Sequence, residues 1–450
     1  MPSVAKAANP DAAEHLAMLI RAREAAIPGY WDFADSPRRG GGHAFFQYPA
    51  MMVPELQGAL LDDLLVADPA VRSVYDPFMG SGTVLLESIY RGLNFDGVDI
   101  NPMAVLLSHV KSHPPSASAA STAVEGVVKQ ARDPSGAPLH TFTGVEKWFH
   151  PQVRQELSLL RQAIRAVAEV ETRRFLWVCL AETVRLVSNS RTSTVKLHIY
   201  SPSDLAARRP KAIAMFESIG KANASRAAEH WARVLKQSAT ALTTEPPEVH
   251  IQRASILSDI VGPQSTDAIM SSPPYGDNGT TVTYGQHSYL PLQWIPHEDL
   301  VGTFEEHLLQ STARIDSLSL GGSRVGALDA RKEIEEKSTA LAEFLPLIGN
   351  RPDLLKKVVA FSRDYETALG RATRPLKRGG FSFWTLGERR VGKQSVPLVR
   401  ITQDFLALHG QTSVLVIDRV LPLKRKRMAG LNQSGATMGT EHILVTVKSS

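Results

Sequence analysis

Hydrophobic residues along this chain fall into short runs separated by polar and glycine-rich turns. Runs at 71–75 and 95–99 have the length of buried strands, and residues 83–91 between them have a helical pattern. Such a strand–helix–strand unit predicts two parallel strands joined by a right-handed crossover. The pattern therefore predicts an α/β fold with helices on both faces of a sheet. Further strand signals occur at 249–276 and near 381–386, 412–418 and 442–447.

Other segments have helical or loop patterns. Residues 1–28 are Ala-rich and helical, and residues 36–42 form a flexible break. Residues 145–240 are expected to be mainly helical, because apolar residues such as Leu157, Leu160 and Ile164 recur at helical spacing. Helices are also expected at 56–65 and 353–371, a loop or linker at 112–140, and irregular polar structure at 277–350.

Composition narrows the class of protein only slightly. The 450 residues are 43% hydrophobic and 21% charged, which is ordinary for a globular protein. The formal net charge of +5 permits a nucleic-acid partner without requiring one. One cysteine, Cys179, excludes a disulfide framework and a cysteine-ligated zinc site. No apolar run reaches the ~18 residues of a membrane span and no secretion signal is evident, so we expect a cytoplasmic protein without a membrane partner.

A glycine-rich turn follows the first predicted strand, in the sequence Asp-Pro-Phe-Met-Gly-Ser-Gly-Thr at 76–83. Gly80 and Gly82 allow a ligand to approach the backbone at the start of the next helix. Leu85 stands where a dinucleotide fingerprint has its third glycine, and no Gly-Lys-Ser/Thr follows. Asp99 ends the second strand, where a carboxylate can accept hydrogen bonds from both hydroxyls of a ribose. The turn therefore indicates a nucleoside site without a polyphosphate.

These residues closely resemble the S-adenosylmethionine-binding segment of DNA amino-methyltransferases, which have a class I (Rossmann-like) methyltransferase fold. The resemblance includes Asp99-Ile-Asn-Pro at 99–102, and Phe-Gln-Tyr-Pro-Ala at 46–50 looks like an additional cofactor motif of that family. Thr83 is either a helix cap or a cofactor contact. The resemblance implies S-adenosyl-L-methionine as cofactor, bound by Tyr48, Pro49, Asp76, Phe78, Gly80, Gly82, Thr83, Asp99, Ile100 and Asp259.

A second motif, Ser-Pro-Pro-Tyr at 272–275, follows the apolar run at 267–270 and resembles the catalytic motif of the same family. The exocyclic amine of a base is a poor nucleophile, and acceptors held still by two prolines would help to aim its lone pair at the methyl group. By the resemblance, Ser272 Oγ and the Pro273 carbonyl accept from the amine, Pro274 stiffens the corner, and Tyr275 stacks on a base flipped out of the duplex.

The first position of this motif bears on the substrate. Relatives with serine there are mostly cytosine-N4 enzymes, whereas aspartate is commoner in adenine-N6 enzymes, so the resemblance favours cytosine N4. The cofactor motif precedes the catalytic motif here, and many cytosine-N4 relatives have the opposite order. The alternatives are an adenine-N6 enzyme, an enzyme acting on RNA, and a non-catalytic DNA-binding subunit that keeps the fold.

Double-stranded DNA is the expected partner, and a cognate endonuclease of a restriction–modification or related defence system is a further candidate. Polar and aromatic residues after the catalytic motif suit contacts to bases or phosphates, and a basic run suits phosphates. No metal site is expected. A further group of candidate DNA contacts, with weaker support from the sequence, lies in the insertion: Arg185, Asn189, Arg191 and Lys196. The candidate DNA contacts are Asn278, Thr280, Tyr284, Gln286, His287, Lys424, Arg425, Lys426 and Arg427.

These patterns divide the chain into six expected segments. The cofactor-binding and catalytic parts of one methyltransferase domain are separated by a mainly helical insertion. The segments are 1–42 (helical and flexible), 43–111 (cofactor binding), 112–248 (insertion), 249–276 (catalytic), 277–352 (target recognition) and 353–450 (the last part of the sheet).

Overall fold

The computed structural model describes residues 10–36, 39–133, 138–240, 246–258, 262–277, 281–421 and 439–449. A seven-stranded sheet in the order β3-β2-β1-β4-β5-β9-β8 forms its centre. The first five strands in this order are parallel, and β9 is antiparallel to both of its neighbours. The strands are β1 (Ser73–Asp76), β2 (Asn94–Asp99), β3 (Val249–Arg253), β4 (Thr266–Ser271), β5 (Leu376–Gly387), β8 (Gln411–Val420) and β9 (Thr440–Lys448).

Alternating side chains of these strands fill two separate cores, one on each face of the sheet. Val74 and Met270 belong to the core under α1 (Pro10–Ala26), α2 (Pro54–Ala67) and α3 (Thr83–Ile89). Tyr75 and Ile269, their neighbours in sequence, belong to the core under α14 (Thr339–Phe344), α15 (Pro352–Thr373) and α16 (Leu398–Leu408). The predicted α/β fold with helices on both faces is confirmed, as is the parallel β1–α3–β2 unit.

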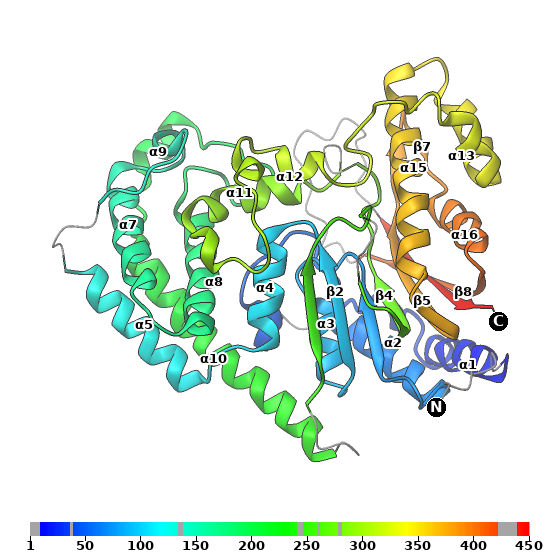
Figure 1. The fold of residues 1–450 in the computed structure, drawn as a ribbon, viewed down its shortest axis with the longest axis horizontal. Coiled ribbons are helices and arrows are strands. Elements are labelled where there is room, and N and C mark those ends of the chain that lie inside the picture. Colours follow the sequence, from blue (N-terminus) through cyan, green and yellow to red (C-terminus); the bar gives the residue numbers. More distant parts are fainter. Residues whose placement is uncertain are drawn as a thin grey trace.

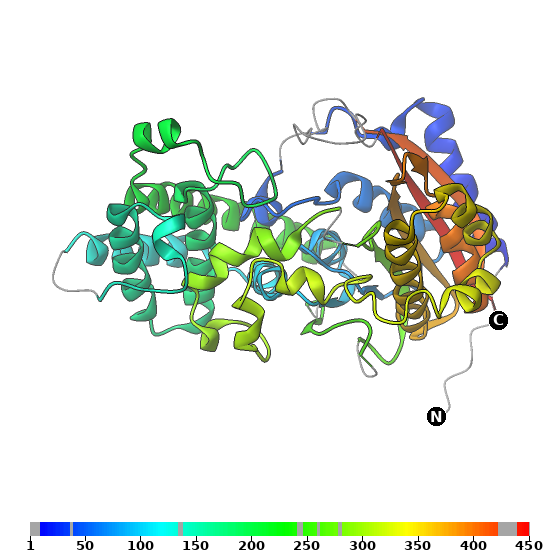
Figure 2. The ribbon, with the colours of Figure 1, turned by 90° about the horizontal axis from the view of Figure 1, so that it is seen from above.

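The insertion forms a third core beside the sheet (Figure 1). Its long helix α10 (Ala212–Thr240) packs on α5 and α8, and α4 (Pro102–Ser112) connects it to the sheet. Cys179 is buried in this core. Seen from above, the insertion and the helices of the last part of the chain lie on either side of the strands (Figure 2). The other helices of the insertion are α5 (Ala117–Ala131), α6 (Val145–Trp148), α7 (Pro151–Arg165), α8 (Val170–Val187) and α9 (Pro202–Ala207).

Two predicted loops contain regular structure. The loop expected at 112–140 is wrong for 117–131, where α5 begins after the N-cap Ser116 and buries Val124, Val127 and Val128 at helical spacing. The region 277–350 contains helices among its turns. They are α11 (Tyr284–Trp294), α12 (Arg314–Ser317), α13 (Arg331–Lys337), α14 and the short 3-10 helices η3 (His297–Asp299), η4 (Glu306–Leu309) and η5 (Leu345–Ile348).

The remaining elements are small. Two 3-10 turns precede the sheet, and a two-stranded ribbon follows β5. They are η1 (Tyr30–Asp32), η2 (Gly41–Ala44), β6 (Arg390–Val391) and β7 (Gln394–Ser395).

Candidate active site

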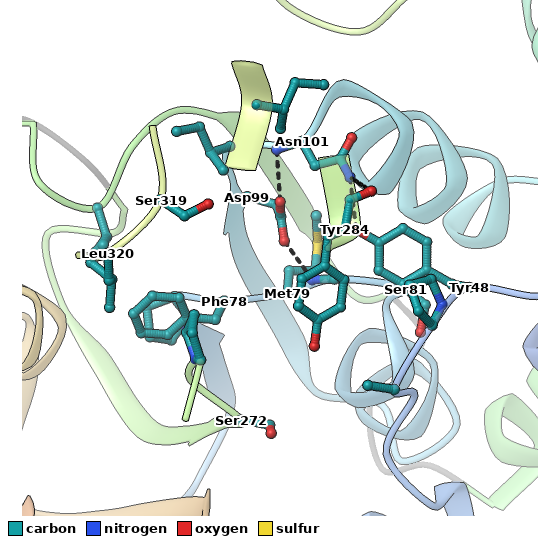
Figure 3. Close-up of a pocket in the computed structure, with 18 of the residues that line it drawn as sticks. Tyr48, Phe78, Met79, Ser81, Asp99, Asn101, Ser272, Tyr284, Ser319 and Leu320 are labelled. Atoms are coloured by element: carbon teal, nitrogen blue, oxygen red, sulfur yellow. Dashed lines mark hydrogen bonds between the residues drawn. The ribbon is translucent and has the colours of Figure 1, made fainter. Parts of the chain in front are cut away.

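A pocket lies at the carboxyl ends of β1, β2 and β4, where ligands of open α/β sheets bind. Its empty space, counted out to the open mouth, is about 920 Å³. In Figure 3, Asp99 and Ser272 lie on opposite sides of it, with Phe78 and Tyr284 between them. Of the predicted cofactor residues, those that line the pocket are Tyr48, Pro49, Phe78, Gly80, Thr83, Asp99 and Ile100.

The glycine turn forms the floor of this pocket. Gly80 and Gly82 have φ angles of 52° and 70°, in the left-handed region that favours glycine. A Cβ atom on Gly82 would lie 2.8 Å from Ser108 Oγ, so the turn also needs glycine for space. Behind the turn, the buried Lys111 Nζ donates to the Ser81 carbonyl at 2.6 Å. Burial lowers the pKa of Lys111 to about 7.

Asp99 has the geometry expected of a ribose acceptor. Its Oδ2 accepts from the Gly80 N–H at 2.8 Å and its Oδ1 from the Asn101 N–H at 2.8 Å. A carboxylate offers about four acceptor positions, so capacity remains for ligand hydroxyls. Burial raises the pKa of Asp99 to about 6, although the backbone N–H bonds oppose this. The carboxylate could therefore accept hydrogen bonds from the two free hydroxyls of a nucleoside.

Two stacked tyrosines close one side of the pocket. The rings of Tyr48 and Tyr284 are 5.7 Å apart at 22°. Asn101, the N-cap of α4, donates from Nδ2 to Tyr48 Oη at 2.9 Å and to Ser288 Oγ at 2.8 Å. Asn101 therefore connects the additional cofactor motif to α11.

Asp76 does not line the pocket and lies beneath it. Its Oδ1 accepts from the Phe78 N–H at 3.1 Å and from Ser271 Oγ at 2.6 Å. It thus joins the glycine turn to the end of β4. Asp76 Oδ2 is buried without a hydrogen-bond partner among the described residues, and burial raises the pKa of Asp76 to about 7. Gly82 also lies outside the pocket lining, and Asp259 lies outside the described residues.

The Ser-Pro-Pro-Tyr corner follows β4 and reaches the pocket through Ser272 and Pro274. Pro273 is buried, and Tyr275 is partly buried beside the lining. Ser272 Oγ is 3.1 Å from Tyr275 Oη, which donates to Glu441 Oε1 at 3.2 Å. Arg389 also holds the corner: it contacts the Tyr275 carbonyl at 3.4 Å and pairs with the buried Asp277 at 2.9 Å.

The sequence reasoning missed one wall of the pocket. Ile315, Leu318, Ser319 and Leu320 come from a segment with no recognised motif. Asp316 in this wall accepts from the backbone N–H groups of Gly285 and Gln286, at 2.8 and 3.0 Å, and so caps α11. Asn101 had a recognisable signal, since Asn followed by Pro is typical of a helix start.

The residues predicted to contact DNA do not lie together in the structure. Tyr284 lines the pocket described above, and Gln286 Oε1 accepts from the Leu197 N–H at 2.9 Å. His287 Nε2 contacts the Gln47 carbonyl at 3.1 Å, and burial lowers the pKa of His287 to about 4. The other predicted DNA-binding residues lie outside the described residues: Asn278, Thr280, Lys424, Arg425, Lys426 and Arg427.

A basic segment of the insertion, residues 188–211, packs beside α11. It contains one carboxylate, Asp204, against five cations, which gives it a net charge of +4. Arg191 and Lys196 are exposed and line a second pocket together with His287. Arg185 lines this pocket too and pairs with Glu182 at 2.5 Å, whereas Asn189 donates to the Lys147 carbonyl. The five cations are Arg191, Lys196, Arg208, Arg209 and Lys211.

The described part of the chain contains neither a candidate metal site nor a candidate membrane-spanning helix. Across the ranges given above, no group of three or more His, Cys, Asp or Glu residues could hold a metal ion. No helix in the same ranges is long and apolar enough to span a membrane.

The fold and the pocket define the class of this protein: it is an α/β protein with a Rossmann-like methyltransferase fold. The chain is similar to the type II methyltransferase M.MvaI of Kocuria varians, with 27% identity over 435 residues that cover 93% of this chain and 92% of that protein. It is also similar to the type II methyltransferase M.MjaII of Methanocaldococcus jannaschii, with 33% identity over 87 residues, 18% of this chain and 16% of that protein. No family model and no solved structure matches the chain. These similarities support a methyltransferase.

Proposed function

We propose that this protein is a site-specific DNA methyltransferase of a restriction–modification or related defence system. It transfers a methyl group from S-adenosylmethionine to the exocyclic amine of a flipped-out base, most favourably cytosine N4. Similarity to a type II methyltransferase over nearly the whole chain supports the DNA methyltransferase assignment.

One observation carries the chemical part of the proposal: a single pocket is lined by both Asp99 and Ser272. Asp99 supplies the acceptor for a ribose, and Ser272 supplies an acceptor for an amine. A nucleoside cofactor held by Asp99 would present its reactive group to a base at Ser272, which favours reaction by proximity.

The chain's residues would prepare the amine rather than activate the methyl group. Ser272 Oγ and the Pro273 carbonyl accept its two N–H bonds, which favours a pyramidal nitrogen with its lone pair free. When bound, S-adenosylmethionine would supply a methyl group on a sulfonium: the N–C bond would form as the C–S bond breaks, the electron pair would return to sulfur, and the methylated amine would lose one proton to water. The Tyr275 ring would stack on the base, which must leave the duplex to reach the pocket.

The basic segment 188–211 supports a DNA partner. It has a net charge of +4 and packs on α11, the helix that also contributes Tyr284 to the pocket. A cationic surface beside the pocket can bind phosphates while the target base enters. Arg191 and Lys196, which are exposed there, are the best candidates for binding phosphates.

The test is methyl transfer with identification of the modified base. The protein is incubated with S-adenosylmethionine carrying a tritiated methyl group and with duplex DNA, and the DNA is digested to nucleosides for mass spectrometry. We expect N4-methylcytosine at a defined sequence. An otherwise identical incubation with RNA separates the two nucleic acids.

Each other outcome overturns a different part of the proposal. N6-methyladenine would overturn the choice of cytosine while leaving the DNA amino-methyltransferase intact. Label in RNA alone would overturn DNA as the substrate. Cofactor binding without label in either nucleic acid would indicate a non-catalytic subunit.

A further inference from the structure

We propose that Tyr275 and Glu441 are positioning residues that fix the hydroxyl hydrogen of Ser272, so that the Ser272 oxygen faces the target amine as an acceptor. This inference rests on the proposed function and adds a role for Glu441, which lies at the start of β9 and far from both motifs in sequence. It also gives the Tyr275 hydroxyl a role that is separate from ring stacking.

A serine at this position has a difficulty that a carboxylate would not have. An ionised carboxylate only accepts hydrogen bonds, whereas a hydroxyl both donates one and accepts two. If the Ser272 hydrogen pointed into the pocket, it would face the amine hydrogens and repel them. Ser272 therefore needs a fixed acceptor outside the pocket for its own hydrogen.

The hydrogen bonds around the corner supply this acceptor in only one consistent direction. Glu441 is an acceptor, and the Tyr275 hydroxyl donates its single hydrogen to Glu441 Oε1 at 3.2 Å. The Tyr275 oxygen can then only accept from Ser272 Oγ, which is 3.1 Å away. The Ser272 hydrogen is thus directed toward Tyr275, and the remaining lone pairs of Ser272 Oγ are available to the pocket that it lines.

The far end of this chain of hydrogen bonds is held rigidly. Arg419, whose side chain is 1% exposed, pairs with Glu441 Oε2 at 2.7 Å. Its other terminal nitrogen donates to the Asp32 carbonyl at 2.8 Å. The guanidinium fixes the position of the Glu441 carboxylate through Oε2 and leaves Oε1 for Tyr275. Burial and the nearby Glu441 carboxylate raise the pKa of Tyr275 well above its ordinary value, so the hydroxyl keeps the hydrogen that this arrangement needs.

The neighbouring serine shows that the two hydroxyls are held differently. Ser271 Oγ donates to Asp76 Oδ1 at 2.6 Å, on the cofactor side of the corner. Ser271 is fully buried, whereas Ser272 is partly exposed to the pocket. Only the second hydroxyl is placed to meet a base.

The experiment removes the Tyr275 hydroxyl and keeps the ring. Y275F leaves the Glu441–Arg419 pair intact, so it tests the inference without unpairing a buried charge. We expect the single-turnover rate of methyl transfer to fall about 10- to 100-fold, less than the roughly 100- to 1,000-fold loss when a preorganised hydrogen bond at a reaction site is itself removed, because Ser272 Oγ remains. The dissociation constants for S-adenosylmethionine and for DNA should stay within about twofold, because the stacking ring remains. Y365F is the matched control: Tyr365 is buried in α15 and its hydroxyl contacts Thr402 at 3.0 Å, and its removal should not change the rate.

Variants of Glu441 test the direction of the network. E441Q keeps a carbonyl oxygen that can accept from Tyr275, so it should lose less activity than E441A. Once the Tyr275 hydroxyl is absent, Glu441 has nothing to orient, and the double variant Y275F/E441Q should be no slower than the slower of its two parents. Fully additive losses would mean that Glu441 acts by another route and would overturn the inference.

Failures of the two proposals are distinguishable. If the wild-type protein transfers no methyl group to DNA, the proposed function is wrong. If the wild type is active and Y275F transfers methyl groups at the wild-type rate, the proposed function stands and the orientation of Ser272 by Tyr275 is wrong.

Discussion

The two halves of the pocket are held together in different ways. The centre of the cofactor half, the glycine turn with Asp99, is local: Asp99 accepts from the Gly80 N–H, only 19 residues away and within one β–α–β unit. The catalytic corner depends on distant side chains. Tyr275 contacts Glu441 166 residues away, and Asp277 pairs with Arg389 112 residues away.

This difference has a structural consequence. Asp99 and the glycine turn need only β1, α3 and β2 in their places, whereas the corner needs β4 together with the antiparallel β8 and β9. Damage to the last strands should therefore disturb the corner first. Asp76 is the described side chain that joins the halves most directly, because it contacts both Phe78 and Ser271.

The largest expected effect comes from breaking the cofactor half alone. D99A removes the acceptor for both ribose hydroxyls and the partner of the Gly80 N–H. Since hydrogen bonds to a charged group contribute about 1.5–3 kcal/mol each, the affinity for S-adenosylmethionine should fall at least about 100-fold. Calorimetric titration of the cofactor measures this. D96A, on the same strand but outside the pocket lining, should bind the cofactor normally; equal losses in both variants would mean that β2 is damaged rather than the ribose site.

The converse change breaks the corner alone. S272A should lower kcat roughly 100-fold, because one acceptor for the amine is removed. Cofactor affinity should remain within about twofold, since the cofactor half does not depend on this hydroxyl. Steady-state kinetics with cofactor titration measure both quantities. S112A is a matched control, because the Ser112 hydroxyl contacts only the His109 carbonyl and the adjacent His113 ring, and none of these residues lines the pocket. A loss of cofactor affinity in S272A would contradict the division into halves.

The same division determines what the sequence could predict. The glycine turn and Asp99 are adjacent parts of one local unit, so their spacing alone indicated the nucleoside site. The corner was predictable as a motif, but its partners Glu441, Arg419 and Arg389 were not, because their contacts depend on strand order and on chain returns of more than 100 residues. Nor did any pattern point to Leu318 or Leu320 as pocket residues.

The prediction for residues 112–140 was wrong because it gave more weight to composition than to the spacing of apolar residues. Residues 112–140 are rich in Ala, Ser, Gly and Pro and were expected to be a loop. The helix α5 forms there because its few valines, at 124, 127 and 128, lie on one buried face against α10 and α7. A count of helical spacing over that segment would have found it.

A third variant, D76N, has a smaller expected effect and tests how Asp76 connects the two halves of the pocket. The pKa of Asp76 is raised to about 7 by burial, so the folded state binds its proton more tightly than the unfolded state does. Protonation of Asp76 therefore adds to the free energy of unfolding. This stabilisation is fully present below the unfolded pKa near 3.8 and is lost as pH rises through about 7. D76N cannot titrate, so its free energy of unfolding should improve relative to wild type between about pH 4 and 7, by on the order of 4 kcal/mol at most.

Denaturant titrations across this pH range measure the difference. Asp267 on the same sheet provides a control of opposite sign. Burial would raise its pKa, but bonds from Lys377 and from the Arg72 and Ser73 segment lower it. Asp267 therefore stabilises the fold above its unfolded pKa, and the advantage of wild type over D267N should shrink as pH falls below about 4. If the difference in free energy of unfolding between D76N and wild type does not change with pH, then Asp76 does not have a raised pKa between the two halves of the pocket.

The variant with the smallest expected effect should leave both halves of the pocket intact. R191E/K196E reverses two exposed charges of the basic segment without touching the lining of the cofactor pocket. We expect DNA affinity at low salt to fall about tenfold, and the slope of log affinity against log salt to become shallower by about 0.9 for each phosphate that the variant no longer neutralises. Cofactor affinity and kcat at saturating DNA should not change. K129E/K332E makes the same change of charge on exposed residues of α5 and α13, and should leave DNA affinity nearly unaltered. If the two double variants weaken DNA binding equally, net charge alone explains the effect and residues 188–211 are not a phosphate-binding surface.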